Sequence, residues 1–264
     1  MAGYVCVSFF NSNRKVVLIV EYDGGRYYGF QWQPAGPTIQ AELENAINRL
    51  TGEQRRVIAA SRTDAGVHAR CQVVSFWTAS QLPPMVMVKA LNHYLPDDIA
   101  VNKAYDVEET FDVRRQAASR EYEYSIVNCA IRSPLDRDRK YLVVNELNID
   151  MMNKACDVLR GQRDFASFCA AFFNGKSTVR TVNEAKVNRE GIDVVFTINA
   201  NSFLPHQVRN TIGLLIRVGL GKIGIEEFVQ IMDAKKLGLA GPTAPAYALC
   251  LTKINYPTIL ELTR

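Results

Sequence analysis

Apolar residues follow two different periods along this chain. In residues 120–124, R-E-Y-E-Y, tyrosines alternate with glutamates, so an extended chain places Tyr122 and Tyr124 on one face of a sheet and the glutamates on the other. In residues 38–50, apolar residues recur every three or four positions, which is typical of a helix with one buried face. Both kinds of segment occur in each half of the chain, and the pattern predicts an α+β protein.

The predicted elements follow the same order twice. In the first half we predict a strand at 16–22, a helix at 38–50, strands at 57–60 and 71–78, a helix at 84–95 and a strand at 99–107. The second half repeats this order, with a strand at 120–127, a helix at 151–159, strands at 179–188 and 193–201, helices at 205–219 and 225–235, and a strand at 248–254. Thr38 is the expected N-cap of the first helix, and Pro84 suits the first turn of the second.

Each half therefore matches the ferredoxin-like βαββαβ plan. We expect an N-terminal extension at 1–15 as a candidate disordered segment, an N-terminal α+β domain at 16–112 and a C-terminal α+β domain at 113–264. Helices should cover one face of each mixed or antiparallel sheet. The other faces would then be free to form a cleft.

Composition narrows the class of protein. The 264 residues carry a formal net charge of +4, with 48% hydrophobic and 22% charged residues, which allows a sizeable core and is compatible with a polyanionic partner without requiring one. Six scattered cysteines without a C-x-x-C pair indicate reduced thiols of a cytosolic protein, and with only three histidines we predict no metal site. The first ten residues lack the pattern of a signal peptide, and no stretch approaches the roughly 20 apolar residues of a membrane-spanning helix.

The strongest chemical signal is S-R-T-D-A-G-V-H-A at residues 61–69. It follows a short apolar run and precedes a strand pattern, so Asp64 is expected on a loop between two strands, two residues after Arg62. Ala65 and Gly66 are small enough to let a ligand approach the backbone. Asp64 is therefore the candidate nucleophile; an aspartate in an ordinary turn with a solvated arginine beside it is the alternative.

Residues 62–69, R-T-D-A-G-V-H-A, resemble the signature of the tRNA pseudouridine synthase I family. Further blocks resemble that family in the same order: E-Y-D-G at 21–24, Y-Y-G-F-Q-W-Q at 27–33, F-D-V-R-R-Q-A-A-S-R-E-Y-E-Y at 111–124 and F-L-P-H-Q-V-R-N at 203–210. The resemblance runs from about residue 16 to the end. It implies the pseudouridine synthase fold with a basic catalytic cleft, and a cytoplasmic homodimeric isomerase acting on uridines 38, 39 and 40 of the tRNA anticodon stem-loop.

The resemblance also implies roles for four residues. Asp64 matches the catalytic aspartate, and Arg209 matches the arginine that pairs with it. Tyr122 would stack on the extruded uracil and is a candidate acceptor of the C5 proton, whereas Arg62 would fill the place that the uridine vacates. The residue pattern alone leaves ordinary alternatives open: a surface arginine for Arg209, core packing for Tyr122 and a structural histidine at His68.

The implied reaction needs no cofactor. It breaks the N1–C1′ bond of uridine, turns the uracil and joins C5 to C1′, so the atoms balance without a redox partner or an activated donor. The sequence has no P-loop and no dinucleotide fingerprint, which agrees with a prediction of no cofactor. Attack by Asp64 at C6 of the base or at C1′ of the sugar stays open.

Contacts with RNA are expected from basic residues beside aromatic ones. The candidates are Phe111, Arg114, Arg115 and Arg120, then Lys176 and Arg180, with Arg137, Arg139 and Lys140 as a third cluster. Taken singly, each cluster also fits a solvated surface.

Several positions depart from the usual family pattern: Ser61, Phe30, Asp112, Pro205, Ala248, and F-F-N-G at 172–175, which replaces a polar stretch. The last departure keeps open a paralogous synthase with a different RNA target. A non-catalytic RNA-binding protein of the same fold is a second alternative. A hydrolase using Asp23 and Asp64 as an acid pair is a third.

Overall fold

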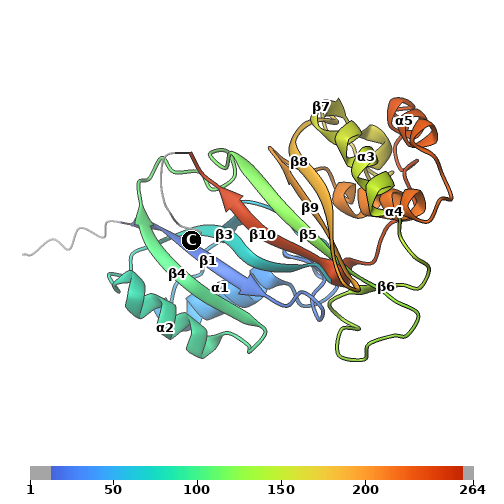
Figure 1. Cartoon of the computed structure of the whole chain (residues 1–264). Helices are drawn as coiled ribbons and strands as arrows, with labels where there is room; N and C mark the ends of the chain where they lie inside the picture. Colours follow the sequence, from blue (N-terminus) through green and yellow to red (C-terminus); the bar gives the residue numbers. More distant parts are fainter. Residues whose placement is uncertain (1–12, 258–264) are drawn as a thin grey trace, which may run out of the picture.

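A continuous mixed β-sheet runs through the molecule (Figure 1). The structure, a computed structural model, describes residues 13–257, and within them the sheet has ten strands. Most of the predicted N-terminal extension lies outside the described residues, but residues 14 and 15 belong to the first strand.

The helices and strands occur in the predicted order. The first half contains β1 (Arg14–Tyr22), α1 (Ile39–Thr51), β2 (Ile58–Ala59), β3 (His68–Thr78), α2 (Pro84–Tyr94) and β4 (Ile99–Val107). The second half contains β5 (Ser119–Asn128), β6 (Tyr141–Val143), α3 (Ile149–Leu159), β7 (Gly161–Asp164), η1 (Ala166–Phe168), β8 (Val179–Glu190), β9 (Asp193–Ala200), α4 (Gln207–Gly219), α5 (Ile225–Asp233), η2 (Ala246–Ala248) and β10 (Leu249–Asn255). The short elements β6, β7, η1 and η2 were not predicted, because segments of three or four residues are too short to show a periodic pattern.

Both halves have the same strand order. It is β4-β1-β3-β2 in the first half and β10-β5-β9-β8 in the second, and the neighbouring strands in each are antiparallel. This is the order of a ferredoxin-like βαββαβ unit, and the predicted repeat is therefore confirmed. A short parallel pairing, in which Cys250 lies beside His68 and Leu251 beside Ala69, joins the two sheets into one.

The helices gather at two places along the sheet. Helices α1 and α2 lie beside β1 and β4, whereas α3, α4 and α5 lie together at the end that carries β7 to β9 (Figure 1). The Thr38 side chain accepts a hydrogen bond from the Ala41 N–H and so caps α1 as predicted, and Pro84 starts α2. No helix within residues 13–257 is long and apolar enough to cross a membrane.

Strand β5 lies at the centre of the sheet and shows the predicted alternation. Tyr122 and Tyr124 are buried on one face, and Glu121 and Glu123 are half-buried on the other. Tyr122 therefore projects from one face of a central strand of the sheet.

We expect Leu251→Ala to lower the free energy of unfolding by about 2–5 kcal/mol, because Leu251 is fully buried on the strand that joins the two halves. Lys253→Ala is the matched control on the same strand, where an exposed side chain should change the free energy by less than about 0.5 kcal/mol. Urea unfolding followed by circular dichroism measures both. Equal effects would contradict the assigned burial.

Candidate active site

Asp64 lies in the loop between β2 and β3, as predicted. The loop is closed by the Val67 N–H, which donates to the Asp64 carbonyl oxygen at 3.1 Å. Gly66 has a φ of +79°, a left-handed conformation that glycine adopts without steric cost. The Asp64 side chain is 33% exposed, so its carboxylate is accessible from the cavity that it lines.

The glycine-rich segment after β1 packs directly against this loop. The Phe30 N–H donates to the Thr63 carbonyl oxygen at 3.1 Å. A Cβ added to Gly24 would lie only 2.0 Å from the Val67 carbonyl oxygen. The glycine-rich segment and the Asp64 loop therefore pack against each other through their backbones. No bulky side chain separates them at Gly24.

Arg209 faces the Asp64 carboxylate. Its Nη1 lies 3.2 Å from Asp64 Oδ2, although 145 residues separate the two in the chain. The Arg209 Nε donates to the carbonyl oxygen of Ala244 at 2.9 Å, so the guanidinium is fixed by two hydrogen bonds in different directions. Helix α4, which carries Arg209, thus supplies a positive charge to the loop of the other half.

His206 is a third member of this group; it lies in the F-L-P-H-Q-V-R-N block, but no role was predicted for it. Its Nε2 lies 3.8 Å from Asp64 Oδ2. The backbone of His206 is left-handed, with a φ of 62°, at the N-cap of α4. Such a conformation is uncommon for a residue other than glycine and is often found at functional sites. A sequence reading misses it because left-handed φ leaves no clear residue pattern.

Tyr122 lies in the wall of the same cavity. Only 5% of the residue is exposed, and its ring meets that of Phe203 edge to face, with centroids 5.3 Å apart. Burial raises the pKa of the Tyr122 phenol to about 12, an effect that its hydrogen bond with Ser61 Oγ at 3.0 Å partly offsets. The phenol is therefore protonated at neutral pH.

A buried glutamine holds Ser61, the residue that bonds to Tyr122, at the start of the Asp64 loop. The Gln72 amide donates to the Ser61 carbonyl oxygen at 2.8 Å and accepts from the Ser61 N–H at 3.3 Å. The same amide reaches the Tyr22 hydroxyl at 3.3 Å, and that hydroxyl lies 2.8 Å from Thr63 Oγ1. Gln72 is fully buried in β3, so it fixes the start of the loop from inside the sheet. A polar residue inside an apolar strand was the available signal, and it was missed.

These side chains surround a cavity of about 790 Å³. Both halves of the chain contribute to it, which agrees with the predicted cleft. The charged and aromatic side chains that line it are Tyr28, Arg62, Asp64, Arg114, Arg120, Tyr122, Phe172, Phe203, His206 and Arg209.

The chain matches the family model for tRNA pseudouridine synthase over residues 18–114 and 155–257. It belongs to the tRNA pseudouridine synthase family. It is 42% identical over 243 residues to the tRNA pseudouridine synthase A of Thermoanaerobacter sp., covering 92% of this chain and 100% of the relative. It is 38% identical over 248 residues to the enzyme of that name from Neisseria gonorrhoeae, covering 94% of each chain.

Among solved structures, it is similar to an H/ACA RNP bound to a substrate RNA containing 2′-deoxyuridine, at 15% identity and a TM-score of 0.35. That match covers 76% of this chain and 44% of the other, and it is too weak to bear on function. Pseudouridine synthases are isomerases, so family membership confirms the predicted reaction class and fold class. Within residues 13–257, no three His, Cys, Asp or Glu side chains are placed to hold a metal ion together.

Two predicted RNA-contacting arginines of this synthase stand free at the cavity. Arg62 and Arg114 both line it, and neither side chain has a carboxylate partner among the described residues. Burial and the neighbouring charge of Arg114 lower the pKa of the Arg62 guanidinium. Two like charges held close together without a carboxylate are placed to receive an anion.

Two other residues predicted to contact RNA are buried. Phe111 is only 2% exposed and packs against Tyr256, with ring centroids 5.4 Å apart. Arg120 is 6% exposed, and its two terminal nitrogens donate to four backbone carbonyl oxygens. Phe111 thus belongs to the core, and Arg120 is a buried brace in the cavity wall. Their burial disfavours the predicted contacts with an RNA backbone.

The remaining predicted cations differ in accessibility. Arg115 and Lys176 are exposed, whereas Arg180 is half-buried and its Nη1 donates to the carbonyl oxygens of Ser177 and Val179. The Asp112 carboxylate accepts hydrogen bonds from the backbone N–H groups of Arg114 and Arg115, which lower the pKa of Asp112 and hold the turn that presents both arginines.

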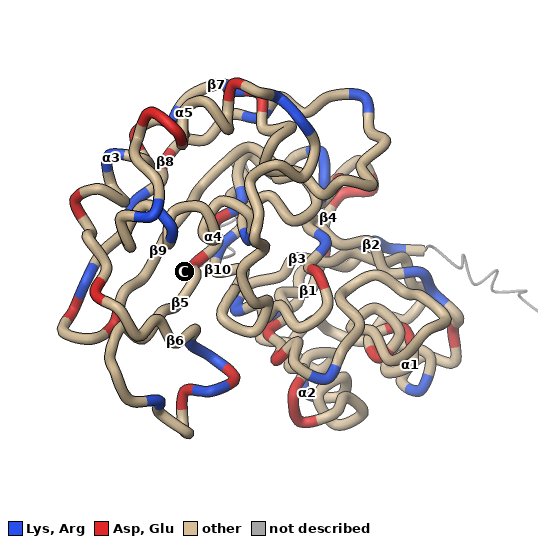
Figure 2. The backbone as a smooth tube through the Cα atoms, turned by 90° about the vertical axis from the view of Figure 1, so that its right-hand side faces the viewer, with Lys and Arg blue, Asp and Glu red and all other residues tan. Residues whose placement is uncertain are grey.

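The third cluster of cations is paired with carboxylates. Lys140 contacts Asp193 at 2.8 Å, and Arg137 contacts Asp138 at 3.1 Å. Figure 2 shows the alternation of basic and acidic positions in the loop before β6. These pairs leave little free positive charge for a polyanion.

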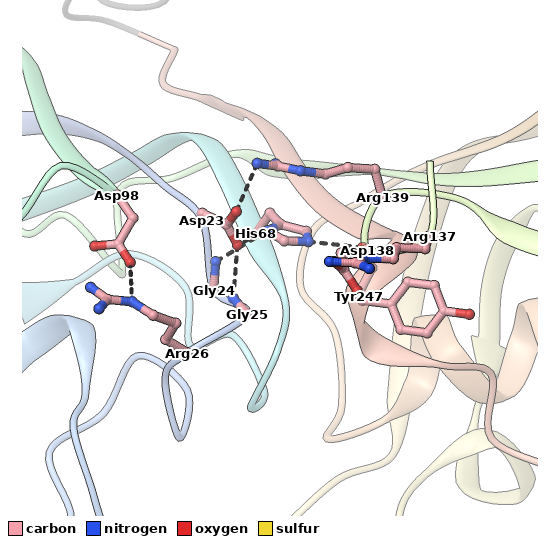
Figure 3. A network of polar contacts seen from close by, with 10 residues as sticks. All are labelled: Asp23, Gly24, Gly25, Arg26, His68, Asp98, Arg137, Asp138, Arg139 and Tyr247. Atoms are coloured by element: carbon pink, nitrogen blue, oxygen red, sulfur yellow. Dashed lines mark hydrogen bonds and ion pairs between the residues drawn. The ribbon is translucent and has the colours of Figure 1, made fainter. Parts of the chain in front are cut away.

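Arg139, the last member of that cluster, reaches across to the first half. Its Nη2 lies 2.7 Å from Asp23 Oδ2, and Asp23 Oδ1 lies 3.0 Å from His68 Nδ1 (Figure 3). His68 is buried, and its Nε2 contacts the Tyr247 carbonyl oxygen at 2.8 Å. His68 is thus a structural histidine. Asp23 is engaged away from Asp64, which argues against an acid pair of these two residues.

The contact between the two motifs predicts unequal effects of substitution at two adjacent glycines. Gly24→Ala should lower both turnover and stability, the latter by about 1–3 kcal/mol, because its Cβ would overlap the Val67 carbonyl and displace the Asp64 loop. Gly25→Ala is the matched control, because its Cβ would meet only a side-chain oxygen of Asp23, at 3.1 Å, and no backbone atom. Thermal unfolding and a turnover assay measure both, and equal losses would contradict the assignment.

Proposed function

We propose that this synthase converts uridine to pseudouridine at positions 38, 39 and 40 of the tRNA anticodon stem-loop. The observation that carries the proposal is the Asp64 carboxylate held 3.2 Å from the Arg209 guanidinium at the cavity that Tyr122 lines. Relatives that cover nearly the whole chain are named tRNA pseudouridine synthase A, which supports tRNA as the substrate.

In the proposed reaction, Asp64 is the nucleophile. Its attack, at C6 of the base or C1′ of the sugar, is followed by cleavage of N1–C1′, rotation of the uracil and formation of C5–C1′. The proton leaves C5, N1 gains a proton, and no electron donor is consumed. Arg209 would stabilise the negative charge of the Asp64 carboxylate when substrate excludes water, because the two groups lie 3.2 Å apart.

Tyr122 is proposed to stack on the extruded uracil. The role of proton acceptor from C5 is disfavoured by burial, because a phenol with a pKa of about 12 is almost entirely protonated at neutral pH. Its hydrogen bond to Ser61 Oγ holds the ring in place. Ser61, a departure from the family pattern, thereby has a positioning role.

Arg62 is proposed to occupy the place that the uridine leaves. Extrusion of a paired base costs on the order of a few kcal/mol, and a planar guanidinium can stack and donate hydrogen bonds in the gap. The absence of a carboxylate partner among the described residues supports this role.

Experiments can distinguish two alternatives from the proposed function. A synthase with a different RNA target is favoured by the F-F-N-G departure, and mapping the modified nucleotide separates it from the proposal. A non-catalytic RNA-binding protein is disfavoured by the intact geometry of Asp64, Tyr122 and Arg209.

We further propose a cytoplasmic homodimer. Every cysteine in the described part of the chain is a free thiol, which is usual in a reducing compartment. Ile131 and Leu135 are exposed apolar residues in the loop before β6 and offer a surface for association. Sedimentation velocity across a range of concentrations tests the dimer.

We expect Asp64→Ala to reduce release of tritium from tRNA containing 5-tritiated uridine to below about one thousandth of the wild-type rate. Binding of tRNA should stay largely intact, because phosphate contacts dominate affinity. Filter binding with the same transcript is the control for folding. Turnover by the variant would refute the role of Asp64; no release by wild-type protein that binds tRNA would refute the proposed reaction.

We expect Arg114→Gln to weaken tRNA binding and to reduce the slope of log affinity against log salt by about 1, because one unpaired cation at the cavity is lost. Arg137→Gln is the matched control, since Arg137 is already paired with Asp138. Binding measured over a series of salt concentrations gives both slopes. Equal changes in the two variants would contradict the assigned phosphate contact.

A further inference from the structure

Phe172 places an exposed aromatic ring at the cavity that holds Asp64. The residue is 73% exposed and lines that cavity, whereas its neighbour Phe173 packs against the core. An isolated exposed apolar side chain is common on protein surfaces and by itself indicates nothing. The surroundings of Phe172, however, fix its position relative to the nucleophile.

The backbone around Phe172 is anchored on both sides. The Phe173 N–H donates to the Ala170 carbonyl oxygen at 3.1 Å, and the Ala170 N–H donates to the Pro205 carbonyl oxygen at 2.9 Å. A Cβ on residue 175 would lie 2.2 Å from the Phe173 ring, so Gly175 allows that ring to fold back over the turn. With Phe173 turned inward, Phe172 is the outward ring of the pair.

His206 orients the exposed ring. The rings of Phe172 and His206 meet edge to face, with centroids 5.7 Å apart and an interplanar angle of 89°. His206 is held in a left-handed conformation, with its Nε2 3.8 Å from Asp64 Oδ2. A single imidazole therefore separates the Phe172 ring from the nucleophile, so whatever lies on that ring is next to the reacting nucleotide.

The other groups at this mouth are suited to a nucleic acid strand. Tyr28, from the first half, lines the same cavity and is 52% exposed. Lys176 is not part of the cavity lining, but it follows Phe172 by four residues in the chain and is exposed. Aromatic rings with nearby cations are how proteins hold unpaired nucleotides, with bases stacked on the rings and phosphates beside the cations.

We propose that Phe172 is a stacking platform for the nucleobase adjacent to the target uridine. This inference rests on the proposed function, because it assumes that a uridine enters the cavity at Asp64. Extrusion of that uridine removes the stacking partner of its neighbour and exposes one face of the neighbouring base. Because Arg62 is proposed to fill the gap inside the helix, the flat ring of Phe172 would stack on the neighbouring base where that base has unstacked at the cavity. The platform would favour RNA substrates in which the base next to the target uridine can leave the helical stack.

A double-mutant cycle tests the platform. Wild-type protein, Phe172→Ala and Phe172→Trp are compared on three stem-loop RNAs with 5-tritiated target uridine: the intact RNA, and two versions in which the base on the 5′ or the 3′ side is abasic. We expect Phe172→Ala to lower kcat/KM by roughly tenfold on intact RNA and on one abasic RNA, and by less than about twofold on the other. Phe172→Trp should retain the wild-type value.

Met85→Ala is the matched control, because Met85 is 76% exposed and is not part of the cavity lining. It should leave kcat/KM unchanged on every RNA. An equal loss by Phe172→Ala on all three RNAs would show that Phe172 acts through His206 and not on a base, and no loss would show that it has no role; either result overturns the inference. Failure of the proposed function differs from both, because wild-type protein would then release no tritium from intact RNA.

Discussion

The short parallel pairing of β3 with β10 is the contact on which the arrangement of the site depends. It places Leu251 beside Ala69, immediately after the Asp64 loop, and so brings the first half of the chain against the second at the centre of the sheet. With this register fixed, Arg209 on α4 lies 3.2 Å from the Asp64 carboxylate. Neither half alone contains both charges, and an aspartate and an arginine left without each other in a half-buried cavity would each lose a stabilising partner.

The site is held by polar groups that are satisfied inside the fold. Gln72 forms hydrogen bonds with both the N–H and the carbonyl oxygen of Ser61. Arg120 donates hydrogen bonds to four backbone carbonyl oxygens behind the cavity wall. Buried groups of this kind are costly when any partner is missing, so they specify one geometry of the loop. With its terminal nitrogens engaged in this way, Arg120 braces the wall of the site.

The useful distinction among the basic residues is whether each has a partner. Arg62 and Arg114 point at the cavity with no carboxylate beside them in the described chain, whereas Arg139 and Lys140 are paired with Asp23 and Asp193. A net charge of +4 says little about this division. The positive potential that a polyanion meets therefore arises from the placement of a few cations and not from their number.

The sequence by itself determined the repeated βαββαβ order, the loop position of Asp64 and the common face of Tyr122 and Tyr124. These three features follow from local periodicity and from short motifs, both of which depend only on residues close together in the sequence. Only the tertiary structure decided that Phe111 is buried and that His206 approaches Asp64. Burial and ion pairing depend on which distant segments of the chain come into contact. Strand register and helix packing across the whole sheet determine those contacts, and a local sequence pattern does not reveal them.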